Sequence, residues 1–190
     1  MKLTLVRRAV QGAVAALCLG AAVPASAVDM LGDTLGFERL YPDLATPYGP
    51  PFSPSSTTVT AGPSDVVTWG NPMVFTEIDP EANTLVFELL ASTSYIGSGG
   101  VFDGYRISGF SHDIQSASLG AYAGPLNIDV AFGNGPGARY VTVNLDGAYF
   151  GGDRFTIEVS MVPEPSAVAL MLAGLAALGW AARARRRPLG

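Results

Sequence analysis

Four segments of the chain alternate apolar and polar residues with a period of two, and this pattern limits the fold more than any other feature. Alternation places successive side chains on opposite faces of an extended strand and is typical of antiparallel strands with one face in water. The segments are 84–90, 127–132, 140–146 and 154–160. Their predicted inward-facing residues are Leu85, Phe87, Leu89, Ile128, Val130, Phe132, Val141, Val143, Leu145, Phe155, Ile157 and Val159.

Glycine-rich stretches separate these segments and predict tight turns, because glycine adopts positive φ without steric penalty. The predicted turns are 97–100, 133–137 and 151–153, the last of which we expect to close a final hairpin. Weaker strand signals lie at 66–69, 102–108 and 116–122, and no helical pattern of ten residues occurs between 30 and 160. The predicted fold class of residues 65–162 is all-β, an antiparallel β-sandwich of jelly-roll or immunoglobulin-like topology.

Residues 28–64 precede this pattern and are rich in proline, which lacks the N–H group that a sheet ladder needs. We therefore expect an irregular arm of loop or edge structure, with one short strand near 57–60. The side chains expected to hold this arm against the domain are Leu40, Tyr41, Tyr48 and Phe52.

The first 27 residues have the three-part order of a secretory signal peptide. A basic start is followed by the apolar run 9–23, which we expect to form a signal helix. Small residues then predict cleavage after Ala27, within the run Ala25, Ser26, Ala27 and Val28. Export by the Sec translocon and cleavage by signal peptidase would leave Val28 as the first mature residue.

The C-terminal segment, residues 163–190, has a second three-part order. Residues 166–182 carry no charge over 17 positions, which is just long enough for a transmembrane helix. A basic cluster follows at 183–187, and the positive-inside rule keeps it in the cytoplasm as a stop-transfer signal. Its members are Arg183, Arg185, Arg186 and Arg187. The predicted orientation places residues 28–162 outside the cytoplasm, as an intermediate anchored in the inner membrane.

The residues Pro163, Glu164 and Pro165 stand directly before this apolar segment. A Pro-Glu-Pro motif, an apolar helix and an arginine-rich end, in that order at the C-terminus, resemble the PEP-CTERM sorting signal. The resemblance covers about the last 28 residues. It implies recognition by an exosortase, a membrane cysteine protease-transpeptidase, in a Gram-negative host that makes exopolysaccharide. An ordinary single-pass anchor is the alternative, because an anchor needs only the apolar helix and its basic flank.

The body of the protein is strongly acidic. Residues 28–162 contain four arginines and fifteen aspartates and glutamates, a formal charge of −11. Such a surface repels phosphate backbones, which argues against nucleic-acid binding. The only cysteine of the chain, Cys18, lies in the predicted signal peptide, so the mature body has no disulfide and no thiolate chemistry.

No catalytic residue is predicted in the body. The only histidine, His112, stands between Ser111 and Asp113, but a catalytic triad is assembled by the fold and not by tandem order. We therefore interpret His112 as a surface-loop residue. One histidine without cysteine also argues against zinc. Glu77, Asp79 and Glu81 alternate without the pattern of a calcium loop and are interpreted as a solvated turn, so calcium is left open without support.

Five tyrosines could stack on a sugar, although on alternating strands we expect most of them to fill or flank the core. They are Tyr95, Tyr105, Tyr122, Tyr140 and Tyr149. The sequence thus predicts a non-enzymatic, cofactor-free protein, exported to the cell surface or secreted, and associated with exopolysaccharide or biofilm. The alternative is a carbohydrate-binding or glycan-active protein built on the same sandwich.

Overall fold

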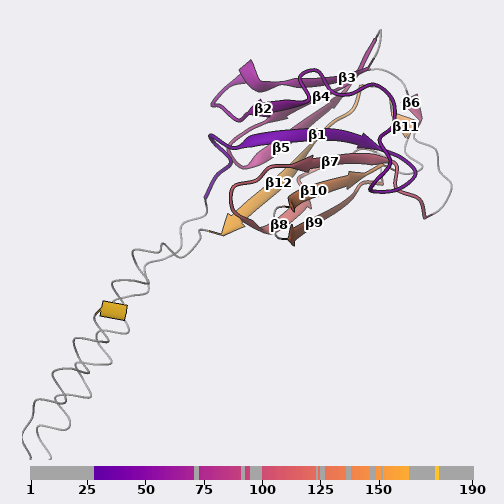
Figure 1. Cartoon of the computed structure of the whole chain (residues 1–190). Coiled ribbons are helices and arrows are strands. Elements are labelled where there is room, and N and C mark those ends of the chain that lie inside the picture. Colours follow the sequence, from indigo (N-terminus) through magenta and orange to yellow (C-terminus); the bar gives the residue numbers. More distant parts are fainter. Residues whose placement is uncertain are drawn as a thin grey trace, which may run out of the picture.

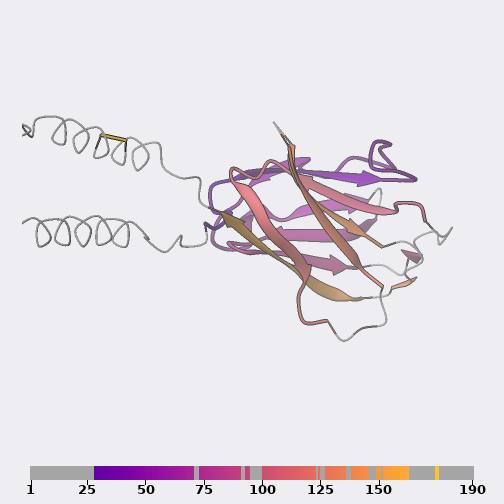
Figure 2. The same ribbon diagram turned by 90° about the horizontal axis from the view of Figure 1, so that it is seen from below.

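The computed structural model describes residues 28–70, 73–90, 93–94, 100–122, 124, 127–135, 138–145, 149–150, 152–162 and 174–175. These residues form two five-stranded antiparallel sheets that lie in two layers (Figures 1 and 2). A two-stranded ribbon is added to them, and helical structure among the described residues is limited to the 3₁₀ turn η1 (Pro63–Asp65) and positions 174–175. The mostly-β prediction is confirmed.

The first sheet has the strand order β2-β1-β7-β10-β9. Its strands are β2 (Ser56–Thr58), β1 (Thr34–Leu40), β7 (Gly104–Ser108), β10 (Ala138–Asn144) and β9 (Asp129–Gly135). The second sheet has the order β3-β4-β5-β12-β8, with β3 (Val67–Gly70), β4 (Val74–Pro80), β5 (Thr84–Leu89), β12 (Arg154–Val162) and β8 (Asp113–Leu119). The ribbon pairs β11 (Tyr149–Phe150) with β6 (Thr93–Ser94).

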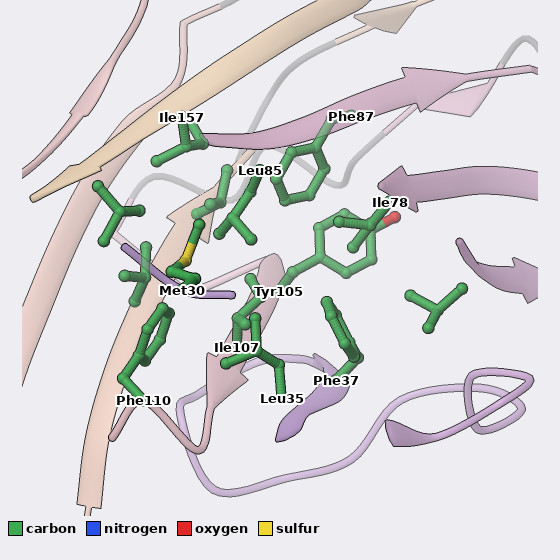
Figure 3. Close-up of a cluster of buried hydrophobic side chains, with 14 of the residues drawn as sticks. Met30, Leu35, Phe37, Ile78, Leu85, Phe87, Tyr105, Ile107, Phe110 and Ile157 are labelled. Carbon is green, nitrogen blue, oxygen red and sulfur yellow. The ribbon is translucent and has the colours of Figure 1, made fainter. Parts of the chain in front are cut away.

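One hydrophobic core lies between the two sheets (Figure 3). Leu35, Tyr105 and Ile107 enter it from the first sheet, and Phe87 and Ile157 enter it from the second. These five side chains are fully buried, and burial of such a side chain contributes about 1.5–3 kcal/mol. The core therefore holds the two layers together in a sandwich arrangement.

Three of the four alternating segments behave as predicted. β5, β10 and β12 bury the expected residues, and β12 continues the alternation to Met161. Thr142 on β10 is buried as well, although its position predicts an outward side chain, and its hydroxyl donates to the carbonyl oxygen of Ala131 at 3.3 Å. The weaker signals also correspond to the strands β3, β7 and β8.

The fourth segment is less buried than predicted. Ile128 and Val130 are half-buried against the core, and Phe132 is 40% exposed. The reason is that β9 is the edge strand of its sheet, where the inner face is only partly covered. Val130, which the alternation predicts to be buried, is therefore only half-buried.

The prediction of an irregular arm over residues 28–64 is wrong for β1. This strand pairs with both β2 and β7 and so lies inside its sheet. Leu35 and Phe37 point into the core, and Arg39, the next alternate residue, is buried as well. Because a charged residue takes the place of an apolar one, the sequence of β1 does not show the alternation of a strand. The short strand near 57–60 is found at Ser56–Thr58, and Leu40 and Phe52 are buried as predicted.

Three turn predictions also need correction. Glu77 and Asp79 lie inside strand β4, not in a solvated turn, and the residues alternating with them, Thr76 and Ile78, are buried. Residues 133–135 belong to β9, so the predicted turn 133–137 is wrong over its first three positions. Gly152 has the positive φ of a turn, but β11 pairs with β6 whereas β12 pairs with β5 and β8, so no β11–β12 hairpin forms.

The sandwich has two distinct ends. Val28 forms an antiparallel bridge with Met161, so both ends of the described body lie together, at what we call the tail end. Asn134 also lies there, because its side-chain amide bonds to the backbone N–H and carbonyl of Ile114, the strand partner of Met161. β10 runs from this end to Asn144, about 20 Å away at the rise of a β-strand, at what we call the far end.

Candidate functional site

Most of the predicted targeting residues lie outside the described residues. This holds for Ala25, Ser26 and Ala27, for the motif residues 163–165 and for the basic cluster 183–187. The predicted membrane segment 166–182 is described only at positions 174–175, which are helical and exposed. In the described part of the chain, no helix has the length and apolar character needed to cross a membrane.

The described body leads directly into the predicted sorting motif. β12 ends at Val162, and its last two residues, Met161 and Val162, pair with Ile114 and Asp113 on β8. β12 lies between β5 and β8, so the residue preceding Pro163 belongs to an internal strand of the second sheet. The body is thus attached to the C-terminal segment without a spacer, and Figure 1 shows β12 ending at the tail end.

Comparison with known proteins decides the nature of this segment. Residues 162–187 match the family model described as the PEP-CTERM protein-sorting motif. The chain carries a PEP-CTERM sorting signal. The match supports an exported protein that is processed by an exosortase, with exosortase as the implied partner. No curated protein and no solved structure matches the chain.

Beyond the PEP-CTERM signal, the clearest site on the body is a polar pocket at the far end. It has a volume of about 350 Å³ and is lined by Gly100, Val101, Phe102, Asn127, Asp129 and Asn144. This volume is at the lower end of the range for small-molecule sites. The pocket offers one carboxylate, two carboxamides and a half-buried aromatic ring.

Strand pairing brings the polar residues of this pocket together. Asp129 begins β9 and is the cross-strand partner of Asn144, which ends β10. Asn127 stands two residues before Asp129 and lines the same pocket. The sequence pattern predicts all three as outward-facing polar residues, but it carries no signal for the β9–β10 register that makes them neighbours.

A buried ion pair lies next to the pocket and is connected to it through Asn144. Arg39 and Asp103, both almost fully buried, form a salt bridge between β1 and the residue that precedes β7. Arg39 also donates to the carbonyl oxygens of Leu40 and Gly104, at 2.7 and 3.0 Å. The backbone N–H of Asp103 in turn donates to the side-chain oxygen of Asn144 at 3.0 Å. The pair therefore positions Asn144 and the backbone next to Phe102.

Aromatic rings surround the buried guanidinium of Arg39. Its central carbon lies 5.4 Å from the ring centroid of Tyr48, 5.7 Å from that of Trp69 and 5.3 Å from that of Tyr105. Cation–π contacts of this kind gain strength when they are desolvated. Gly104, whose carbonyl accepts from Arg39, allows β7 and β10 to approach closely, since a Cβ there would lie 1.9 Å from the carbonyl oxygen of Val143.

The other residues considered from the sequence make contacts of their own outside the far-end pocket. His112 lies in a bend before β8, and its Nδ1 is 2.6 Å from the hydroxyl of Ser111, while Asp113 is ion-paired with Arg139 at 2.7 Å. Within the described ranges, no three His, Cys, Asp or Glu side chains are grouped to hold a metal ion.

The tyrosines do not form an exposed stacking platform in the described part of the chain. Tyr105 is buried in the core, Tyr122 is half-buried and donates to Asp153 at 3.1 Å, and Tyr140 is half-buried. Tyr95 and the side chain of Tyr149 lie outside what the structure describes. The polar pocket at the far end is lined by an aromatic residue, Phe102, which sequence reasoning did not select.

Two acidic residues of the second sheet and its 3₁₀ turn lack a donor for one buried carboxylate oxygen each. Asp65 accepts from the backbone N–H of Thr60 through Oδ2, but its Oδ1 has no partner, and neither has Oδ1 of Asp79. Burial raises the pKa of Asp79 above its ordinary value, and the negative charges of Glu81 and Asp65 raise it further. The charged carboxylate of Asp79 is therefore less favourable in the folded protein than in the unfolded chain.

Replacing Asp79 with asparagine should stabilise the protein at neutral pH. Because the folded pKa of Asp79 lies above the unfolded value, its contribution to stability is present at low pH and is lost as the pH rises through the folded pKa. We expect Asp79→Asn to gain up to about 1 kcal/mol at pH 7, the scale of partly screened charges, and little at pH 3. Urea unfolding at both pH values measures this difference.

Asp43 provides a control of opposite sign. Its pKa is lowered, first by the hydrogen bond from the backbone of Ala45, so its contribution to stability is present above the unfolded pKa and is lost in acid. Asp43→Asn should therefore destabilise at pH 7 and lose this effect toward pH 3. Equal responses of the two variants to pH would contradict the assignment for Asp79.

Proposed function

We propose that this chain is a non-enzymatic surface or matrix protein of an exopolysaccharide-producing envelope, delivered by its PEP-CTERM signal. The observation that carries this proposal is the position of that signal relative to the body. The signal follows β12 directly at the tail end, and the far-end pocket is about 20 Å away. A membrane or surface attachment through the C-terminal segment would leave the pocket facing outward.

The proposed route has three steps. The Sec translocon exports the chain, and signal peptidase cleaves after Ala27. The body is then held outside the cytoplasm by residues 166–182, with the arginines of 183–187 inside. An exosortase cleaves near Pro163, Glu164 and Pro165, and the acidic body reaches the cell surface or the medium. The bridge between Val28 and Met161 is compatible with this route, because it keeps the two processing positions at one end of the body.

A carbohydrate-binding role is the second candidate, and the far-end pocket favours it over glycan hydrolysis. Glycoside hydrolases use a pair of carboxylates that flank the bond to be broken. The described residues that line this pocket include one carboxylate, that of Asp129. Its other polar groups are the carboxamides of Asn127 and Asn144, which donate and accept hydrogen bonds but do not serve as the acid or nucleophile of that reaction.

Mass spectrometry of the protein purified from its native host tests the proposed route, because it determines both termini at once. We expect the mature protein to begin at Val28 and to end near residues 163–165, without the segment 166–190. An intact C-terminus on the surface protein would contradict exosortase processing and favour an ordinary anchor. A mature N-terminus upstream of Val28 would contradict the predicted signal-peptidase site alone.

A further inference from the structure

We infer that the far-end pocket is a binding site for a neutral sugar residue, so that the body holds polysaccharide at the end remote from its sorting signal. The inference rests on the proposed function for its biological setting but on the pocket for its chemistry. The lining combines hydrogen-bonding side chains with one aromatic ring in a volume of about 350 Å³. Sugars present the matching combination of hydroxyl groups and apolar ring faces.

The polar lining matches neighbouring hydroxyl groups. The carboxylate of Asp129 is an acceptor with two oxygens, and the amide of Asn127 both donates and accepts. The hydroxyl groups of a sugar likewise donate and accept, so the donors and acceptors of these two side chains can both find partners on it. Asn144 stands opposite Asp129 across the β9–β10 pair, and its side-chain oxygen is oriented by the N–H of Asp103. The lining is thus built on paired strands rather than on exposed loop positions alone.

Phe102 supplies the apolar surface that a sugar ring needs. It is half-buried, precedes the buried Asp103, and its backbone N–H donates to the carbonyl oxygen of Pro42 at 3.0 Å. The ring is therefore attached to a fixed part of the backbone. A binding site built on such a rigid support loses less conformational entropy when its ligand binds.

The charge of the site selects for a neutral sugar. Among the residues that the structure describes, the pocket is lined by one carboxylate and by no lysine, arginine or histidine. The body around it has a formal charge of −11. Uronate, sulfate or phosphate groups would be repelled by both, since electrostatic complementarity governs partner choice. The openness of the pocket to solvent also suits one unit within a longer polymer.

Binding of the full chain in detergent to an array of neutral hexose oligosaccharides and matched uronic-acid oligosaccharides tests this inference. We expect binding to neutral members only, with the dissociation constant of the strongest ligand measured by calorimetry. Asp129→Ala and Asn127→Ala should each weaken binding about tenfold or more, because each removes hydrogen bonds to the ligand. Phe102→Ala should weaken it as well, whereas Phe102→Tyr should retain it.

Glu158→Gln is the matched control, because Glu158 is an exposed acid on β12 in the other sheet and should leave binding unchanged. Thermal unfolding of each variant confirms that the fold is intact. Absence of neutral-glycan binding, preference for uronates, or Asp129→Ala binding as well as wild type would overturn the inference. Calcium uptake that is lost in Asp129→Ala, without sugar binding, would overturn it too. Release by the exosortase is measured separately, so either proposal can fail without the other.

Discussion

Alanine at both Pro163 and Pro165 should trap the acidic body in the membrane fraction. Proline disfavours helix at its own position and at the residue before it, so we expect the two prolines to keep the segment before 166–182 extended, as a protease needs for binding. Without them, the helix predicted for residues 166–182 can extend toward Val162, since alanine is the best helix former. We expect release from the membrane to fall at least tenfold in the native host, as measured by fractionation and immunoblotting.

Two companion variants sharpen this experiment. Glu164→Ala should also reduce release, because it removes the only charge of the motif. Removal of residues 183–187 should impair both the membrane stop and the processing, since each arginine costs about 2.5–3.5 kcal/mol at the bilayer centre. Ser160→Ala, just before the motif and in strand β12, is the control that should be released normally. Normal release of the double proline variant would show that processing is indifferent to the motif.

Removing the buried guanidinium of Arg39 should destabilise the body by about 3–5 kcal/mol, the cost of breaking a buried ion pair on one side. Asp103 is 2% exposed, so it would keep its charge in a buried place without its cationic partner. The rings of Tyr48, Trp69 and Tyr105 would lose their cation at the same time. Urea unfolding of Arg39→Ala measures the loss of free energy.

An exposed ion pair between β1 and β7 provides the control for the effect of burial. Arg106 and Glu38 bond at 2.6 Å, but their side chains are 32% and 45% exposed. Arg106→Ala should therefore cost only about 0–1 kcal/mol. The double variant Arg39→Met, Asp103→Leu should recover much of the lost stability, because apolar residues remove the desolvation cost of both charges. A cost for Arg39→Ala as small as that of Arg106→Ala would contradict the role assigned to the buried pair.

Signals that depend on neighbouring residues were predictable from the sequence. The match to the PEP-CTERM sorting motif over residues 162–187 agrees with the resemblance based on Pro163, Glu164, Pro165 and the arginines that follow. The inward faces of β5, β10 and β12 were predictable too, since alternation along one strand is set by the geometry of that strand.

The sequence failed where the environment of a residue comes from distant parts of the chain. Asp79 was interpreted as part of a solvated turn because a run of acids usually faces water, but β3 and β5 enclose the strand that carries it. Phe132 was predicted to be buried because it follows the alternation, but its strand lies at a sheet edge. In both cases the neighbouring strands decided the burial, and the local pattern carried no information about them.

The sequence by itself determined the sorting signal and the antiparallel β character of the body, because both depend on residues that are close together in the chain. Only the tertiary structure decided that β1 is an internal strand. The charge of Arg39 can be buried there because it is paired with Asp103, 64 positions away. The tertiary structure also decided the far-end pocket, which exists because the β9–β10 register sets Asp129 beside Asn144. Strand pairing and buried charge pairing are long-range interactions, and their energies depend on partners that no local pattern specifies.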